Sequence, residues 1–396
     1  MQFAERLKPL QQNVFADMDQ AKAEARAAGR SLIDLSLGSS DLPTPPRVLE
    51  AIAQSLPDAS THGYLLHHGT QSFRKAAAAW YEGKYGVSVN PETEVLSLIG
   101  SQEGTAHLPL AVMNPGDVAL LMDPGYPSHS GGVHLANGRI HTMPLRAENA
   151  FLPVLDDIPA DVCRQARMMV LSYPHNPTTA IAPLSFFKAA VSFCQQNGIV
   201  LVHDFPYGDI VFEGGPAPSV LQADPGKSVS IEFFTMSKSY NMGGFRVGYA
   251  IGNAELIRAL RQVKAAVDFN QYRGILNGAI AALQGPSDSV KTVAETFRQR
   301  RDACVQTLRS LGWDIEMPAA TMYIWAKLPE PWSQDSIHFC TELVKATGVA
   351  AAPGAGFGPH GEGYIRLALV HPPEILEAAA HKMVTFLHGV RQQAKS

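Results

Sequence analysis

The chain has 396 residues, of which 46% are hydrophobic and 17% are charged, an ordinary balance for a soluble globular protein. This length corresponds to about two domains. Its 32 basic and 36 acidic residues give a formal net charge of −4 with no long run of either sign. That balance argues against a surface for nucleic acid or for an anionic membrane.

The four cysteines lie far apart, and no C-x-x-C pair is present. A zinc site or a disulfide framework is therefore not expected, and reduced thiols in a cytoplasmic protein are the default. The first thirty residues are charged throughout and lack the apolar core of a signal peptide, and no later run approaches the length of a membrane span. We therefore expect a cytoplasmic protein that has no membrane segment.

The first part of the chain combines helices with one short strand. Residues 17–28 are rich in Ala, Lys, Glu and Arg and precede a glycine, which predicts a helix with a glycine stop. A short apolar strand then leads to Gly38, and a proline-rich connector leads to a helix over 46–54. A loop that carries Tyr64 precedes another helix, over about 71–84.

From residue 94 the chain alternates apolar runs of strand length with helical stretches. This alternation predicts an α/β fold, in which a mostly parallel sheet is covered by helices on both faces. Ligands of such sheets bind beyond the carboxyl ends of the strands. The runs span 94–100, 117–127 with its turn, 166–174, 198–205, 230–236 and 245–252.

After Asn253 the pattern becomes helical again, with a break at Gly285 and Pro286. Two further apolar runs and three helical stretches then indicate a smaller α+β unit. We predict three segments: an N-terminal arm and part of the small domain over 1–45, a large domain over 46–285, and a small C-terminal domain over 286–396.

The stretch 230–248 places one lysine in a particular setting. An apolar strand is followed by hydroxyls at Thr235, Ser237 and Ser239 around Lys238, and Arg246 lies eight residues further on. Burial at a strand end favours the neutral, nucleophilic form of an amine. The hydroxyls and the arginine suit an anionic group such as a phosphate. The alternative is a surface loop with an ordinary solvated lysine.

Other polar residues also follow strand-length runs. Asp204 ends one run, and a buried carboxylate needs a cation or donors, so the alternative to catalysis is a structural salt bridge. Asn176 precedes a proline, where a turn residue is common, and Tyr126 could stack on a planar ring or belong to the core. Arg366 lies within an apolar run, where a carboxylate ligand or an internal acidic residue would have to pair with it.

Two glycine-rich segments differ in their context. Residues 100–104 lie between a strand and a helix, where backbone N–H groups can bind a phosphate, although most such turns bind nothing. Residues 354–358 precede a strand, so we predict a flexible loop there. The chain has no G-x-S-x-G elbow, which removes the common hydrolase interpretation, and the histidines of 62–68 lack a metal-binding spacing.

Three motifs occur together: S-K-x-x-N-x-x-G-x-R over 237–246, N-P-T at Asn176, and D-x-x-Y from Asp204 to Tyr207. From Gly38 to Arg366 the chain resembles the class I and II aminotransferases of the aspartate aminotransferase fold (fold type I), which depend on pyridoxal 5′-phosphate. The similarity is greatest to the subgroup that includes LL-diaminopimelate and alanine aminotransferases. It implies a seven-stranded, mostly parallel sheet, and transfer of an amino group between an amino acid and a 2-oxo acid, with glutamate and 2-oxoglutarate as one pair.

The resemblance also implies roles for individual residues. Lys238 would bind the cofactor aldehyde covalently and then act as the base at the substrate Cα. Asp204 would pair with the cofactor ring nitrogen and keep it cationic. Asn176 and Tyr207 would hydrogen-bond the ring 3-oxygen, and Tyr126 would stack on the ring. Lys238, Asp204 and Tyr126 would thus form the catalytic group.

The remaining implied roles concern the phosphate and the substrate, and no metal is implied. The substrate would bind to Gly38, Asn176 and Arg366, with the arginine on its α-carboxylate. Tyr64 would reach the phosphate of the partner subunit, so a homodimer with shared sites is expected. The phosphate would otherwise be held by Arg246, Thr235, Ser237 and the backbone of Ser101 and Gln102.

The chain departs from the family pattern at a few positions. His175 replaces a frequent asparagine, Thr179 a glycine and Phe245 a tryptophan, but none of these changes removes a group that the chemistry needs. Arg273 is unusual in its segment, and we hypothesise that it meets a distal substrate carboxylate; an interface salt bridge is the alternative.

Two other functions compete with transamination. The first is a β-eliminating C–S lyase on the same scaffold. The second is a cofactor-binding regulator without turnover, but the chain offers no room for a DNA-binding module before Asp34 or after the closing helix.

Overall fold

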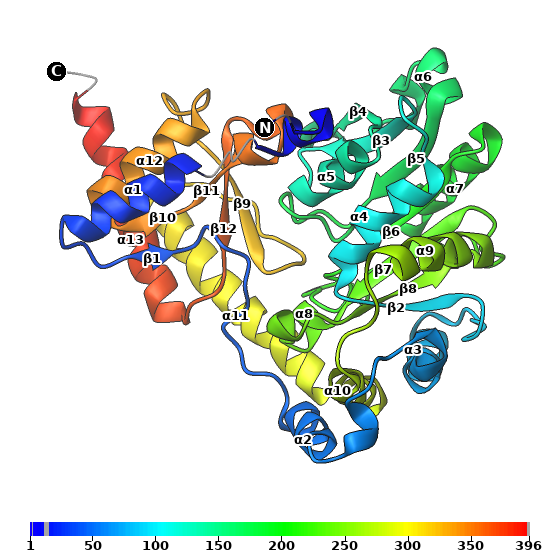
Figure 1. The fold of residues 1–396 in the computed structure, drawn as a ribbon. Helices are drawn as coiled ribbons and strands as arrows, with labels where there is room; N and C mark the ends of the chain where they lie inside the picture. The colour runs from blue at the N-terminus through cyan, green and yellow to red at the C-terminus, as the bar shows by residue number, and fades with distance from the viewer. Residues whose placement is uncertain (2, 12–15, 394–396) are drawn as a thin grey trace.

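The computed structural model describes residue 1, residues 3–11 and residues 16–393, and it consists of two layered units (Figure 1). The large unit contains a seven-stranded sheet in the order β2-β8-β7-β6-β5-β3-β4. The neighbours from β7 to β4 pair in parallel, and only β8 runs antiparallel to both of its neighbours. The predicted α/β fold with a mostly parallel sheet is thus confirmed. The strands are β2 Val95–Leu98, β3 Val118–Asp123, β4 Arg139–Pro144, β5 Ala166–Leu171, β6 Val200–Asp204, β7 Ser230–Thr235 and β8 Gly248–Gly252.

Both faces of this sheet are buried, which explains the continuous apolar runs of the central strands. Successive residues of a strand point to opposite faces. Val118 and Leu120 therefore pack in one apolar layer with α3 and α7, while Ala119 and Leu121 pack in the other with α4 and α9. The helices of this unit are α2 Pro46–Ser55, α3 Gln71–Tyr85, α4 Ser101–Val112, α5 Pro127–Leu135, α6 Ala160–Gln165, α7 Leu184–Asn197, α8 Met236–Ser239, α9 Ala254–Val267 and α10 Arg273–Gln284.

The small unit packs helices against an antiparallel sheet in the order β11-β12-β9 and a parallel pair, β1 with β10. Through that pair and α1, the N-terminal segment joins the core of the C-terminal part, where Met18 and Leu35 are buried. The exact limits of the three predicted segments stay a prediction. The elements are α1 Ala16–Ala27, β1 Ile33–Asp34, α11 Asp288–Ser310, β9 Tyr323–Lys327, α12 Ser336–Thr347, β10 Val349–Ala350, β11 Ala352–Pro353, β12 Tyr364–Ala368 and α13 Pro373–Gln393.

The glycine-rich segment 354–358 differs from the predicted flexible loop. It forms a short 3₁₀ turn, Gly354–Phe357, in which Gly354, Gly356 and Phe357 are buried. A Cβ atom on Gly354 would lie 1.9 Å from the carbonyl oxygen of Gly361. These glycines therefore permit close backbone packing rather than mobility.

The edge strand β4 has no counterpart among the predicted strands. Its residues are mostly exposed or half-buried, so it lacks the apolar run that marks the central strands. Within the described part of the chain, no helix combines the length and the apolarity that a bilayer crossing requires.

Candidate active site

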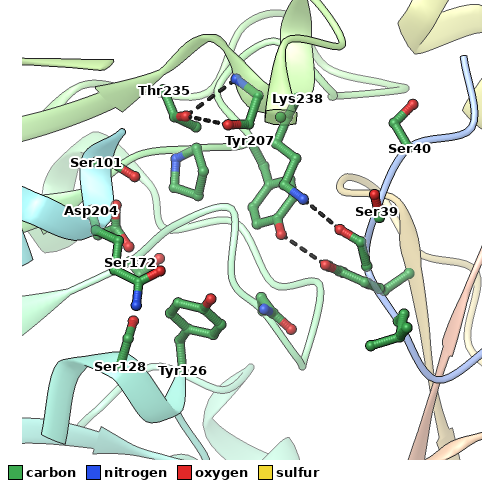
Figure 2. Close-up of a pocket in the computed structure, with 18 of the residues that line it drawn as sticks. Ser39, Ser40, Ser101, Tyr126, Ser128, Ser172, Asp204, Tyr207, Thr235 and Lys238 are labelled. Atoms are coloured by element: carbon green, nitrogen blue, oxygen red, sulfur yellow. Dashed lines mark hydrogen bonds between the residues drawn. The ribbon is translucent and has the colours of Figure 1, made fainter. Parts of the chain in front are cut away.

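A cavity of about 470 Å³ lies between the two units, beyond the carboxyl ends of β5, β6 and β7. It brings together every predicted site residue except Tyr64. Figure 2 shows Asp204, Tyr207, Lys238 and Tyr126 around the same space. The predicted residues that line the cavity are Gly38, Ser101, Gln102, Tyr126, Asn176, Asp204, Tyr207, Thr235, Ser237, Lys238, Arg246 and Arg366.

Lys238 is half-buried in α8, the short helix that follows β7. Thr235 caps this helix, because its hydroxyl accepts a hydrogen bond from the Ser237 N–H at 3.2 Å. The Lys238 Nζ donates to the carbonyl oxygen of Gly38 at 2.5 Å and lies 5.9 Å from the centre of the Tyr207 ring (Figure 2). The amine thus reaches from the large unit to the N-terminal segment that follows β1.

Asp204 is the last residue of β6 and is only 5% exposed. Its Oδ2 pairs with His129 Nε2 at 3.0 Å, so the partner of this carboxylate is a histidine of α5. Its Oδ1 is buried and has no hydrogen-bond partner among the described residues. An unpaired buried acceptor is costly, and a ring N–H bound in the cavity would satisfy it.

Sequence reasoning missed His129. Its spacing could have identified it: His129 lies three residues after the predicted site residue Tyr126, so a helix beginning there places both side chains on the same face. The two rings meet edge to face with their centroids 5.7 Å apart. Tyr126 therefore lies on the same side of the cavity as the histidine that holds Asp204.

Sequence reasoning also missed Tyr323, which comes from β9 of the small unit. Its hydroxyl lies 2.9 Å from that of Tyr207. Burial and the neighbouring Tyr323 raise the pKa of Tyr207 well above its ordinary value. Burial also acts to raise the pKa of Tyr323, but the charges of Lys238 and Arg366 outweigh it, so this pKa lies below its ordinary value. This hydrogen bond joins the two units at the cavity.

Arg366 lies in the middle of β12 and is buried. Its Nη1 donates to Asn176 Oδ1 at 2.8 Å, and its Nη2 donates to the Ser36 carbonyl at 2.7 Å. The rings of Tyr323 and Phe357 lie 4.4 Å and 4.6 Å from its guanidinium carbon. None of the described acidic residues forms an ion pair with it, so the predicted alternative of an internal acidic partner is wrong, and its charge remains available for a carboxylate ligand.

Arg246 and the start of α4 form another corner of the cavity. Gly100 has a φ of +74°, which favours glycine, and a Cβ atom there would lie 2.4 Å from Arg246 Nη2, so the arginine packs closely on this turn. Ser101 and Gln102 occupy the first turn of α4, where backbone N–H groups have no partner within the helix. Together with the hydroxyls of Thr235 and Ser237, this corner has the donors and the positive charge that a phosphate needs.

Four residues singled out in the sequence lie elsewhere. Tyr64 is 87% exposed, and its ring lies 5.6 Å from that of Phe269, outside the cavity. Arg273 is half-buried at the start of α10 and does not line the cavity. The hypothesis that it meets a distal substrate carboxylate therefore stays untested. His175 and Thr179 are buried in the turn around Asn176, where His175 Nδ1 lies 2.7 Å from the Thr178 hydroxyl.

The chain belongs to the aminotransferase class I and II family, whose model matches residues 30–383. It is therefore a transaminase, as the motifs predicted. It is 43% identical over 376 residues to the LL-diaminopimelate aminotransferase of Desulforudis audaxviator, which covers 95% of both chains. It is also 43% identical over 384 residues to LL-diaminopimelate aminotransferase 2 of Trichormus variabilis, which covers 97% of this chain and 98% of the relative.

Solved structures show the same similarity. A probable N-succinyldiaminopimelate aminotransferase from Thermus thermophilus is 44% identical with a TM-score of 0.90, and the match covers 94% of this chain and all of the other. Substrate-bound BacF from Bacillus subtilis is 33% identical with a TM-score of 0.92, and the match covers 98% of each chain. The predicted aspartate aminotransferase fold is confirmed, and the lyase alternative gains no support.

Proposed function

We propose that this transaminase depends on pyridoxal 5′-phosphate. One observation carries the proposal: the buried Oδ1 of Asp204 has no partner among the described residues and borders the cavity that contains Lys238. A pyridine N–H would satisfy this oxygen, and the carboxylate would keep the ring nitrogen protonated. The Arg246 corner would hold the phosphate, while Tyr207 and Asn176 would hydrogen-bond the ring 3-oxygen and Tyr126 would cover the ring.

When bound, the cofactor supplies an electron sink for the negative charge that develops at the substrate Cα. The residues of the chain do the rest. Arg366 binds the substrate α-carboxylate and so orients one Cα–H bond. Lys238 Nζ removes this proton and returns it, because this amine lines the cavity and lies beside the Gly38 carbonyl, next to the proposed substrate site. Asp204 would hold the ring nitrogen of the bound cofactor in its protonated form.

We propose glutamate and 2-oxoglutarate as one substrate pair and a diaminopimelate-type amino acid as the other amino donor. The names of the relatives at 43% and 44% identity support the diaminopimelate-type donor, and the family resemblance supports the glutamate pair. The exposed Ser39 and the half-buried Ser40 also line the cavity, and their hydroxyl groups can hydrogen-bond a polar distal end of a substrate. A panel of amino donors, each tested with 2-oxoglutarate, checks the choice, and keto-acid-dependent turnover without released thiol or ammonia separates it from the lyase.

We further propose a homodimer in which Tyr64 reaches the phosphate of the partner's site. The support is its 87% exposure beside Phe269, itself 50% exposed, because large exposed aromatics in a cluster often mark an interface. Sedimentation of the purified protein measures the oligomeric state. A monomer with full activity would remove this proposal.

We also propose a cytoplasmic location for the enzyme. Its four cysteines are buried and form no disulfide, which fits a reducing compartment. Fractionation of cells that express the tagged protein would test this location.

The experiment that tests the cofactor is chemical trapping. Borohydride reduction of the purified holoenzyme should leave a pyridoxyl group on Lys238, detected by peptide mass spectrometry. The Lys238→Ala variant should show no label and lose at least about 10³-fold in transamination rate, because both the covalent attachment and the base are removed. A holoenzyme without label at Lys238 would refute the proposal.

A further inference from the structure

The turn between β2 and α4 is closed by a carboxylate that does not line the cavity. Glu103, the third residue of α4, folds back so that its Oε2 accepts from the Ile99 N–H at 2.5 Å. Its own N–H donates to the Gly100 carbonyl at 3.2 Å. The side chain thus satisfies an N–H at the start of the helix, much as in a capping box, and it shapes the turn that presents Ser101 and Gln102 to the cavity.

Glu103 has a buried cation as its partner. Lys264 comes from α9, is 4% exposed, and its Nζ donates to Glu103 Oε1 at 2.7 Å and to Asp268 Oδ1 at 3.0 Å. Burial raises the pKa of Glu103 above its ordinary value, although Lys264 opposes this effect. His107 also faces the carboxylate, with its Nδ1 3.7 Å from Oε1. The Lys264 ammonium group thus forms a buried ion pair with the Glu103 carboxylate that closes the turn.

The charge of Glu103 matters for the adjoining corner of the cavity. Backbone N–H groups at a helix start attract an anion, but a carboxylate in the same turn repels it, and this repulsion is weakly screened inside a protein. We propose that Glu103 and Lys264 are positioning residues for the phosphate subsite: Glu103 shapes the turn, and Lys264 cancels its charge so that the turn can bind a phosphate dianion. This inference rests on the proposed pyridoxal phosphate dependence.

A metal ion is not needed to explain the cluster. Ligand atoms of Glu103, His107 and Asp268 lie within 4.8 Å of one another, as they would around a cation. The Lys264 ammonium already bonds to both carboxylates of this group. The cation that these acids require is therefore part of the chain.

The test compares two probes that differ only in the phosphate. Full-length apoenzyme is titrated at pH 8 with pyridoxal 5′-phosphate and with pyridoxal, and binding is followed by absorbance. Lys264→Met should weaken the binding of pyridoxal phosphate at least tenfold and that of pyridoxal less than twofold, because only the phosphate meets the uncompensated charge. Adding Glu103→Gln should restore pyridoxal phosphate binding to within threefold of the wild type, since an amide oxygen still accepts from Ile99 but carries no charge.

A matched control is available in the same unit. Lys227 is 8% exposed, its Nζ lies 3.4 Å from Glu94, and neither residue lines the cavity. Lys227→Met should leave the ratio of the two affinities unchanged. Should Lys264→Met fail to fold, Glu103→Gln alone carries the test, because removing the carboxylate charge while Lys264 remains must keep or raise the affinity for pyridoxal phosphate.

The outcomes separate the two proposals. Equal weakening of both probes in Lys264→Met, no recovery in the double variant, or a loss of affinity in Glu103→Gln overturns the positioning role. A wild-type protein that binds neither probe overturns the cofactor proposal and this inference with it. A wild type that prefers the phosphorylated probe, with the selective loss and recovery described, supports both.

Discussion

The two walls of the active-site cavity are built by different means. The wall of the large unit carries Asp204 and Thr235 as the last residues of β6 and β7, with Lys238 in the short helix that follows. The wall of the small unit carries Arg366 in the middle of β12. Side chains at the strand ends are placed by the sheet itself, whereas Arg366 depends on partners from several other segments.

The partners of Arg366 show what this difference means. Asn176 belongs to the large unit, Ser36 to the N-terminal segment and Phe357 to the turn after β11. The wall of the large unit therefore contains most residues of the proposed cofactor site, whereas the proposed carboxylate-binding arginine is positioned only where the two units meet. Changes on the first wall should affect the chemical step, and changes on the second should affect substrate binding.

The largest effect within this comparison is expected for Asp204→Ala. Loss of the carboxylate should lower kcat by about 10²- to 10⁴-fold with little change in KM, because the group acts on charge that develops during reaction. Steady-state kinetics measures this split. His129→Asn, which removes the histidine hydrogen bond to Oδ2 and the ring contact with Tyr126, should cost about tenfold or less. An Asp204→Ala enzyme with normal kcat would show that this wall does not set the rate.

Arg366→Gln tests the wall that the small unit contributes to the cavity. Losing a charged hydrogen bond to a carboxylate costs about 1.5–3 kcal/mol, so kcat/KM should fall by about 10- to 150-fold, mainly through KM. The absorbance of the bound cofactor should change little, because the arginine would bind the substrate directly and would reach the cofactor only through Asn176. An equal loss of cofactor affinity would contradict the division between the two walls.

His175 lies beside Asn176, where the two walls meet. This histidine should make the free energy of unfolding depend on pH. Burial and the nearby His129 lower its pKa to about 3 in the folded protein, against 6.5 for an ordinary histidine. Between these values the unfolded chain binds a proton that the folded chain does not, so stability is lost as the pH falls from 6.5 towards 3. From pH 7 to pH 5 this histidine should lower the free energy of unfolding by about 2 kcal/mol.

Chemical denaturation of the wild type and of His175→Asn at pH 7 and pH 5 measures the contribution of His175 to the free energy of unfolding. The variant should lose about 2 kcal/mol less than the wild type on acidification. The exposed His388 offers a control, and His388→Asn should follow the wild type. An identical loss in wild type and His175→Asn would mean that His175 is not held neutral.

Tyr323→Phe is expected to have the smallest effect. It removes the hydrogen bond between the two units at Tyr207, worth about 0.5–1.5 kcal/mol, so kcat/KM should fall about 2- to 12-fold. Cofactor affinity should remain, because Tyr207 keeps its own hydroxyl. A loss as large as that of Arg366→Gln would assign Tyr323 to substrate binding itself.

Much of the large-unit wall could be predicted from sequence because it follows from local pattern. Apolar runs marked the strands that end at Asp204 and Thr235 and the strand that precedes Asn176, and the motif around Lys238 indicated the family. The edge strand β4 was missed because its residues are exposed, and the 354–358 turn was misjudged because its burial depends on distant backbone.

The hydrogen-bond partners could not be predicted in the same way. His129 lies 75 residues from Asp204, Tyr323 lies 116 residues from Tyr207, and Ser36 lies 330 residues from Arg366. The pair of Glu103 and Lys264 likewise joins two helices that are 161 residues apart in the chain. No local spacing connects such residues.

The sequence by itself determined the kinds of chemical groups and the strand ends on which they stand, because strand burial and short motifs are encoded over a few neighbouring residues. Only the tertiary structure decided that, among the described residues, Asp204 keeps an unpaired buried oxygen and the buried Arg366 has no acidic partner. The physical reason is that a hydrogen bond forms only when donor and acceptor come within about 3 Å, and the packing of remote segments sets that distance.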